Sequence, residues 1–205
     1  MKLTPRKLTP RNLSALAGLA LIPFSMAPAL ATDFTVLDAS KSTIGFAFKQ
    51  MNVPSSGAFR KVSGSIDIDP DKPAQSKAEI DVALASVDAG SDEASEALAD
   101  SLWFDTKAFP IARFVATSFS PLDDNKQGDR QYKVVGDMTI KGQTHPIESV
   151  ASFHEKGDTG VFEGAFTLKR ADFKIGTGMW ADFSTVANEI QVKFRLVIHT
   201  AASQK

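Results

Sequence analysis

The side chains that most often carry catalysis or bind metals are few and scattered in this chain of 205 residues. Its three histidines, His145, His154 and His199, have none of the short spacings with which histidines of one element bind a metal together. The chain has no cysteine, which excludes thiolate metal sites, a cysteine nucleophile and disulfides. We therefore predict no metal site, no resident cofactor and no catalytic residue, and we expect a protein that is not an enzyme.

Other motifs that could support chemistry are also weak. Gly176-Thr177-Gly178 lacks the strand-to-helix context and the following lysine of a phosphate-binding loop, so a turn is expected there. Acidic pairs such as Asp67 and Asp69 fall at predicted strand ends, where solvated carboxylates are usual. No Gly-x-Ser-x-Gly motif of a serine hydrolase is present. Any site is therefore expected among the apolar side chains.

Apolar residues alternate with polar ones along much of the chain, which is typical of antiparallel strands with one face in water. This pattern predicts eight strands and a short additional one at 33–37. The eight lie within residues 44–48, 62–68, 78–84, 111–119, 132–140, 145–153, 162–168 and 190–198. Turns are expected between them, including one at Pro54-Ser55-Ser56-Gly57. The acidic stretch that begins at Asp88 leads into 94–99, where a helix of two to three turns is predicted.

These elements predict an all-β fold, an eight-stranded antiparallel β-barrel with one short helix in a connection. A barrel of this size either fills with side chains or holds one ligand. The predicted hydrophobic lining consists of Phe46, Phe48, Ile66, Ile80, Val82, Phe104, Phe114, Met138, Phe162, Phe166, Trp180 and Phe194. A filled core remains the alternative, although Gly64, Gly136 and Gly164 on the predicted inward faces favour free space.

Residues 1–31 have the features of a secretory signal peptide, with an early basic segment, a short apolar stretch and Ala29-Leu30-Ala31 before the expected cleavage site. Four of the 23 cations lie in this segment, and cleavage after Ala31 would leave 19 cations against 24 acids, a net charge of −5. An acidic body without a basic stripe argues against nucleic-acid binding. We expect a periplasmic protein whose single domain covers residues 32–205.

Five groups of motifs occur in an order that resembles the YceI-like family of exported, lipocalin-like lipid-binding proteins. They are Ser42–Lys49, Gly57-Ala58-Phe59 leading to Gly64–Pro70, Trp103-Phe104-Asp105 with Phe109–Phe114, Gly136–Thr144, and Gly164–Phe173. The resemblance extends over 33–199. It implies a barrel that encloses a long isoprenoid chain, a quinone tail or a polyprenyl carrier, and that binds this chain without a cofactor and without catalysis.

The same resemblance bears on the polar residues and the partners. Arg170 and Asp172 match an Arg-x-Asp-Phe motif of the family and are candidates for the rim, with a structural ion pair or a strand-end turn as the other interpretation. Many relatives have a histidine where this chain has Gln50. Two alternatives remain open: an enzyme acting on a lipid in the barrel, and a ligand-free, stress- or redox-related accessory partner of a membrane b-type cytochrome. Transient membrane contact and a homodimer are compatible with the sequence.

Overall fold

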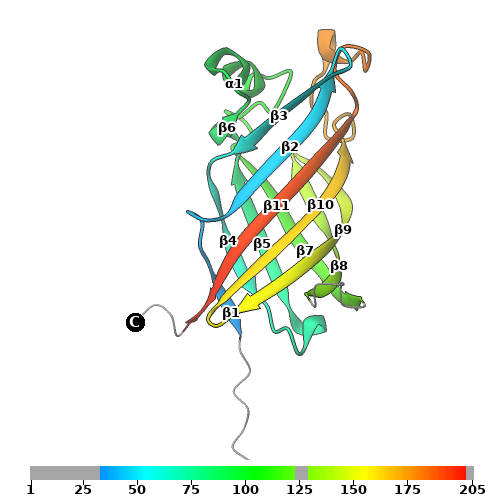
Figure 1. Cartoon of the computed structure of the whole chain (residues 1–205). Helices are drawn as coiled ribbons and strands as arrows, with labels where there is room; N and C mark the ends of the chain where they lie inside the picture. The colour runs from blue at the N-terminus through cyan, green and yellow to red at the C-terminus, as the bar shows by residue number, and fades with distance from the viewer. Residues whose placement is uncertain (1–32, 123–128, 202–205) are drawn as a thin grey trace, which may run out of the picture. The chain divides into compact units, whose positions relative to one another are not determined.

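The computed structural model describes residues 33–122 and 129–201, which form one antiparallel sheet of 11 strands with a single α-helix (Figure 1). The strands are β1 (Phe34–Leu37), β2 (Thr43–Gln50), β3 (Val53–Phe59), β4 (Val62–Asp67), β5 (Lys77–Ala83), β6 (Val87–Asp88), β7 (Ile111–Leu122), β8 (Arg130–Ile140), β9 (Gln143–Lys156), β10 (Thr159–Lys169) and β11 (Glu189–Thr200). Short 3-10 turns occupy Pro73–Gln75, Leu84–Ser86 and Gly178–Trp180. Residues 1–31, predicted to be a signal peptide, lie outside the described residues.

The all-β antiparallel prediction is confirmed, and so is the single short helix. Helix α1 (Asp92–Ala99) begins after Ser91, whose side-chain oxygen accepts a hydrogen bond from the backbone N–H of Ala94. Asp92 and Glu93 in its first turn interact favourably with the positive end of the helix dipole. In the described residues, no helix has the length and apolar character that a membrane span requires.

The predicted number of eight strands is wrong, mainly because β3 was expected to be a turn. Its residues Pro54-Ser55-Ser56-Gly57 pair instead with β2, with Lys49 opposite Pro54 and Phe46 opposite Gly57. The turn lies before them, at Met51 and Asn52, whose φ angles are 47° and 64°. Two consecutive residues with positive φ form the type of two-residue turn that joins twisted hairpin strands.

The sheet curls around an apolar interior, but its backbone pairing does not run continuously around the curl. In the order β4-β5-β7-β8-β9-β10-β11-β2-β3-β6, the end strands β4 and β6 are not paired with each other. Strand β1 links the two sides at one end only, because it pairs with β11 and Phe34 exchanges two backbone hydrogen bonds with Ile68, just after β4. The simple closed barrel predicted from the sequence is therefore a curled sheet fastened by β1.

The two ends of the curled sheet differ. At the β1 end, shown at the bottom of Figure 1, Phe34, Ile68, Phe153 and Ile198 are almost completely buried and belong to one hydrophobic cluster. At the opposite end, helix α1, the tip of the β2–β3 hairpin and the segment after β10 come together. This second end is built from connecting segments, and it positions the candidate site.

Candidate functional site

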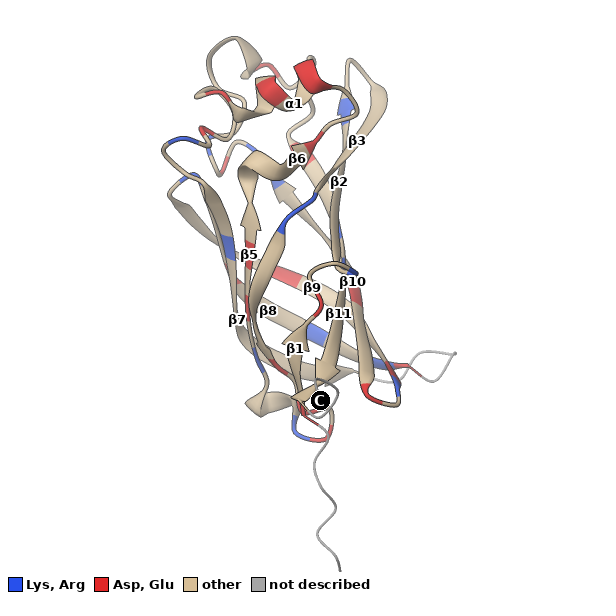
Figure 2. Ribbon diagram, turned by 90° about the vertical axis from the view of Figure 1, so that its left-hand side faces the viewer, with Lys and Arg blue, Asp and Glu red and all other residues tan. Residues whose placement is uncertain are grey.

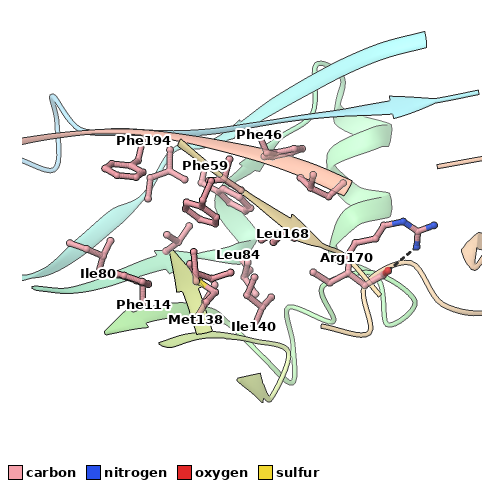
Figure 3. A pocket seen from close by; sticks show the side chains of 18 of the residues that line it. Phe46, Phe59, Ile80, Leu84, Phe114, Met138, Ile140, Leu168, Arg170 and Phe194 are labelled. Atoms are coloured by element: carbon pink, nitrogen blue, oxygen red, sulfur yellow. Dashed lines mark hydrogen bonds between the residues drawn. The ribbon is translucent and has the colours of Figure 1, made fainter. Parts of the chain in front are cut away.

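The inward faces of the strands surround a cavity of about 440 Å³, within the size range of small-molecule sites (Figure 3). The labelled Phe46, Phe59, Phe114 and Phe194 point into the space between the strands, and Arg170 lies at one end. Four lining residues have a polar side chain that is not aromatic: Gln50, Ser55, Ser149 and Arg170. Within the described residues, no carboxylate or imidazole lines this cavity.

All twelve residues predicted to form the hydrophobic lining border this one cavity. They are Phe46, Phe48, Ile66, Ile80, Val82, Phe104, Phe114, Met138, Phe162, Phe166, Trp180 and Phe194. Strand alternation placed ten of them, while Phe104 and Trp180 come from connecting segments. The structure thus brings the predicted set together, and the binding of a ligand by these residues stays a prediction.

Several lining residues were not predicted. Phe59 was missed because strand β3 was not expected, and its ring packs 5.5 Å from Phe46 and 5.8 Å from Phe104, measured between ring centroids. Trp103 lies 5.5 Å from Trp180 in the same way. Helix α1 contributes Ala94, Ala97 and Leu98. Its short stretch of small apolar residues was the only sequence signal for this contribution.

The cavity is closed at the β1 end and accessible at the α1 end. Toward β1, the lining residues Ile66, Ile68, Phe119 and Leu196 are each at most 6% exposed. At the other end, the lining side chains of Phe48, Gln50, Ser55, Leu98 and Trp180 are partly exposed. We call these five residues the mouth. These exposures indicate a route into the cavity between α1, the β2–β3 hairpin and the segment before β11.

Three phenylalanine rings cover glycines of a neighbouring strand, which keeps the rings against the wall of the cavity. Gly164 stands opposite Phe194, and a Cβ atom built on Gly164 would lie 2.5 Å from Cζ of that ring and 2.9 Å from the carbonyl oxygen of Val150. The ring of Phe46 covers Gly57, and the ring of Phe114 covers Gly136, in the same manner. Gly136 and Gly164, expected to leave free space, thus leave room for a ring against the wall of the cavity. Gly64 does not, because its added Cβ would meet the backbone of β5.

We expect Gly164→Ala to destabilise the protein by about 1–3 kcal/mol, because the added methyl group overpacks the space beneath Phe194 and pushes the ring toward the cavity. Urea denaturation measures this loss. Gly45→Ala is the matched control, since its Cβ would meet only the carbonyl oxygen of Gly57 at an ordinary 3.5 Å. Equal stability of the two variants would contradict the proposed role of the glycine.

Arg170, predicted at the rim, is instead 1% exposed and lies beneath the segments that border the mouth. Its guanidinium donates five hydrogen bonds to backbone carbonyls. The acceptors and distances are Ala187 (3.1 Å), Ile175 (2.9 Å), Gly176 (2.7 Å), Trp180 (2.7 Å) and Val186 (2.8 Å). Burial lowers the pKa of Arg170 from its usual value. These bonds hold 175–187 in place at the end of β10.

The ion pair considered for Arg170 is not formed. No carboxylate among the described residues lies within ion-pair distance of its guanidinium, although the Trp103 and Phe183 rings lie 5.9 Å and 5.2 Å from its central carbon. Asp172, the other rim candidate, is exposed and does not line the cavity. Its backbone carbonyl lies 3.0 Å from Nε2 of His145. The strand-end turn, the third interpretation, agrees with this geometry.

The remaining polar groups of the lining differ in their availability. Ser149 donates its hydroxyl to the carbonyl of Ala165, 2.9 Å away, so its polarity is satisfied within the sheet. The side-chain amide of Gln50 forms no hydrogen bond with any residue that the structure describes. Because an amide both donates and accepts, Gln50 can form a hydrogen bond with a polar atom at the mouth.

Comparisons with known proteins agree with this architecture. A model of the YceI-like domain matches residues 36–198. A UPF0312 protein of Pseudomonas fluorescens is 28% identical over 162 residues, which cover 76% of this chain and 77% of the relative.

Two solved structures extend the comparison. The crystal structure of Burkholderia cenocepacia BcnA is 39% identical, with a TM-score of 0.74, and the match covers 78% of this chain and 98% of BcnA. A polyisoprenoid binding domain from Saccharophagus degradans shares the fold with a TM-score of 0.65 at 17% identity, over 83% of this chain and 99% of that domain.

Proposed function

Because the chain belongs to the YceI-like domain family, we propose that it is a binding protein that holds a long-chain isoprenoid lipid, of the quinone or polyprenyl type, in the cavity of its curled sheet. The observation that carries this proposal is the cavity itself, about 440 Å³ in volume and lined almost entirely by hydrocarbon. The polyisoprenoid binding domain of Saccharophagus degradans, which shares the fold, supports the choice of ligand class.

The energetics of such a lining favour the lipid tail over its head. Each CH₂ group removed from water contributes roughly 0.8 kcal/mol, whereas one hydrogen bond contributes a net ~1 kcal/mol. A few isoprene units therefore determine most of the affinity, and polar groups at the mouth orient the head. The cavity lining offers no described acid or base for proton transfer, which supports binding rather than conversion of the lipid.

The place of action is part of the same proposal. The signal-peptide-like segment 1–31 supports export and a carrier role in the periplasm. An isoprenoid lipid that leaves the membrane there needs a protein that shields it from water. N-terminal sequencing of the protein recovered from the periplasmic fraction tests the predicted cleavage after Ala31. A protein found only in the cytoplasm with Met1 retained would overturn this part of the proposal.

The test of the ligand is direct. The full chain is expressed in a bacterium that exports proteins, purified, extracted with organic solvent, and the released lipids are identified by mass spectrometry. We expect about one isoprenoid molecule per protein. An empty extract from folded protein, or a lipid of another class at the same stoichiometry, would overturn the proposal.

Gln50 gives a finer prediction about the head of the ligand. We expect Gln50→Leu to weaken the binding of an isoprenoid with a polar head by about fivefold to tenfold, the worth of one hydrogen bond. Binding of an isoprenoid hydrocarbon without a head should not weaken. Gln191→Leu, on the exposed face of β11, is the control. Competition binding measures both affinities, and an equal loss for both ligands would contradict a contact with the head.

A further inference from the structure

Four exposed apolar side chains lie on two segments beside the mouth. Met51 and Val53 at the tip of the β2–β3 hairpin are 68% and 62% exposed, and Met179 and Phe183 in the segment before β11 are 78% and 50% exposed. We call these four residues the apolar rim. Single exposed apolar residues are ordinary, but a group of them on adjoining segments indicates an interaction surface.

The two segments are held together by backbone hydrogen bonds. The N–H of Met51 donates to the carbonyl of Thr185 at 2.8 Å, and the N–H of Ala187 donates to the carbonyl of Lys49 at 2.9 Å. A β-bridge joins Gln50 and Val186 between them. The second segment is also fixed from below by the bonds of Arg170 to Trp180 and Val186. The apolar rim is therefore a preformed surface.

The apolar rim is continuous with the mouth along the chain. Gln50 and Ser55, which line the cavity, enclose Met51 and Val53 in sequence, and Trp180 lies directly after Met179. An insoluble chain that passes between the cavity and a bilayer must cross the mouth. A rim that enters the bilayer interface would remove water from this path, as apolar side chains of interfacial segments do.

The size of this surface favours a bilayer over a second protein molecule, and its charge indicates which kind of bilayer it suits. Four exposed apolar side chains are far fewer than the about 20–30 residues per partner that a stable protein interface buries. The hairpin tip carries no acid, whereas the second segment carries the exposed Asp182, whose carboxylate accepts a hydrogen bond from the N–H of Ser184. Helix α1, at the same end of the sheet, carries the acids Asp92 and Glu93 (Figure 2). Such a surface suits an uncharged bilayer better than an anionic one.

From this geometry we infer that the apolar rim docks the mouth on the surface of a lipid bilayer, where the cargo enters and leaves the cavity. The inference rests on the proposed function for its purpose, since a carrier of an insoluble lipid must meet the membrane. It adds a partner of stated chemistry, a zwitterionic lipid surface, and the four side chains that contact it.

Flotation with phosphatidylcholine vesicles tests the inference. The protein is produced from the full chain in the form that the cells release, and its mass is checked to show that every variant has the same N-terminus. We expect Met51→Ser together with Met179→Ser to reduce vesicle binding by at least about tenfold, because the favourable transfer of two thioether side chains from water into the bilayer is lost. Val115→Ser together with Val150→Ser is the matched control, since these residues are 38% and 51% exposed on β7 and β9. This pair should float like the unaltered protein.

Each outcome decides a different point. Failure of the unaltered protein to float, or equal flotation of the rim variant, would overturn the docking inference. So would a concentration-dependent dimer in light scattering that the rim variant loses, because the rim would then bind a second copy. Solvent extraction of the same samples measures the cavity separately. If the extract is empty but the protein still floats through its rim, the proposed ligand is overturned and the docking inference stands. If the cavity is filled but the protein does not float, the docking inference is overturned and the proposed ligand stands.

Discussion

Replacement of Arg170 by methionine should lower the free energy of unfolding by about 3–5 kcal/mol, the largest effect we expect from one substitution outside the apolar lining. Methionine approximates the length of the arginine stem but donates no hydrogen bond, so the five carbonyls of 175–187 lose their shared donor at once. Buried acceptors without a partner are costly, and bonds from a charged donor are the stronger kind. Urea denaturation followed by tryptophan fluorescence would report both the stability and the environment of Trp103 and Trp180.

The comparison with Arg195 isolates the effect of burial. Arg195 lies on the exposed face of β11 and pairs with Glu163 at 2.8 Å. Arg195→Met should therefore cost less than about 1 kcal/mol, as exposed ion pairs contribute little. Arg170→Lys should recover part of the loss, because an ammonium group has three donors in place of five. If Arg170→Met and Arg195→Met were equally stable, the buried network would not be what holds the mouth in place.

Introduction of a carboxylate into the cavity should abolish retention of the lipid. Phe166 lines the cavity with its ring 6.5 Å from that of Phe194, and Phe166→Asp would place an unpaired charge in a hydrocarbon surrounding. Desolvation of such a group costs several kcal/mol, which corresponds to a loss of affinity of at least about 100-fold. Mass spectrometry of the solvent extract should then find less than a few percent of the lipid bound by the unaltered protein.

The neighbouring residue provides a matched control for this substitution. Ala165 is adjacent on β10 and points to the exposed outer face, so Ala165→Asp adds the same charge without entering the cavity. Phe166→Leu removes the ring but keeps an apolar side chain, which separates the effect of charge from that of lost packing. Circular dichroism shows which variants are folded. Full lipid content in folded Phe166→Asp, or equal loss in Ala165→Asp, would contradict the cavity as the binding site.

Alternation of apolar and polar residues was sufficient to predict the long strands and their inward faces. It failed at β3, where Pro54, two serines and Gly57 have the composition of a turn. A proline is tolerated there because the first part of β3 pairs only with β2, while β6 covers just Ala58 and Phe59. A free edge does not need the missing N–H. Local composition could not reveal this edge, since it results from the pairing of distant segments.

Arg170 shows a second limit of the sequence. A charged residue at the end of a strand is usually exposed, and the Arg-x-Asp pair suggested an ion pair. The structure instead surrounds the guanidinium with the carbonyls of a loop that returns over β10. Every residue has a backbone carbonyl whatever its side chain, so a site built from carbonyls cannot be predicted from residue types.

The fastening of the sheet by β1 has a consequence for turnover of the cargo. Because the cavity is closed at the β1 end, a ligand cannot pass through it from one end to the other. A new molecule therefore cannot enter at the β1 end and push the bound one out. Under the proposed function, ligand exchange is then dissociative, because the bound lipid must leave, tail last, before the next one enters. The rate of exchange is set by dissociation of the bound lipid and not by the concentration of free lipid. Loading follows the same constraint in reverse, so the head group stays at the surface and remains within reach of whatever receives it.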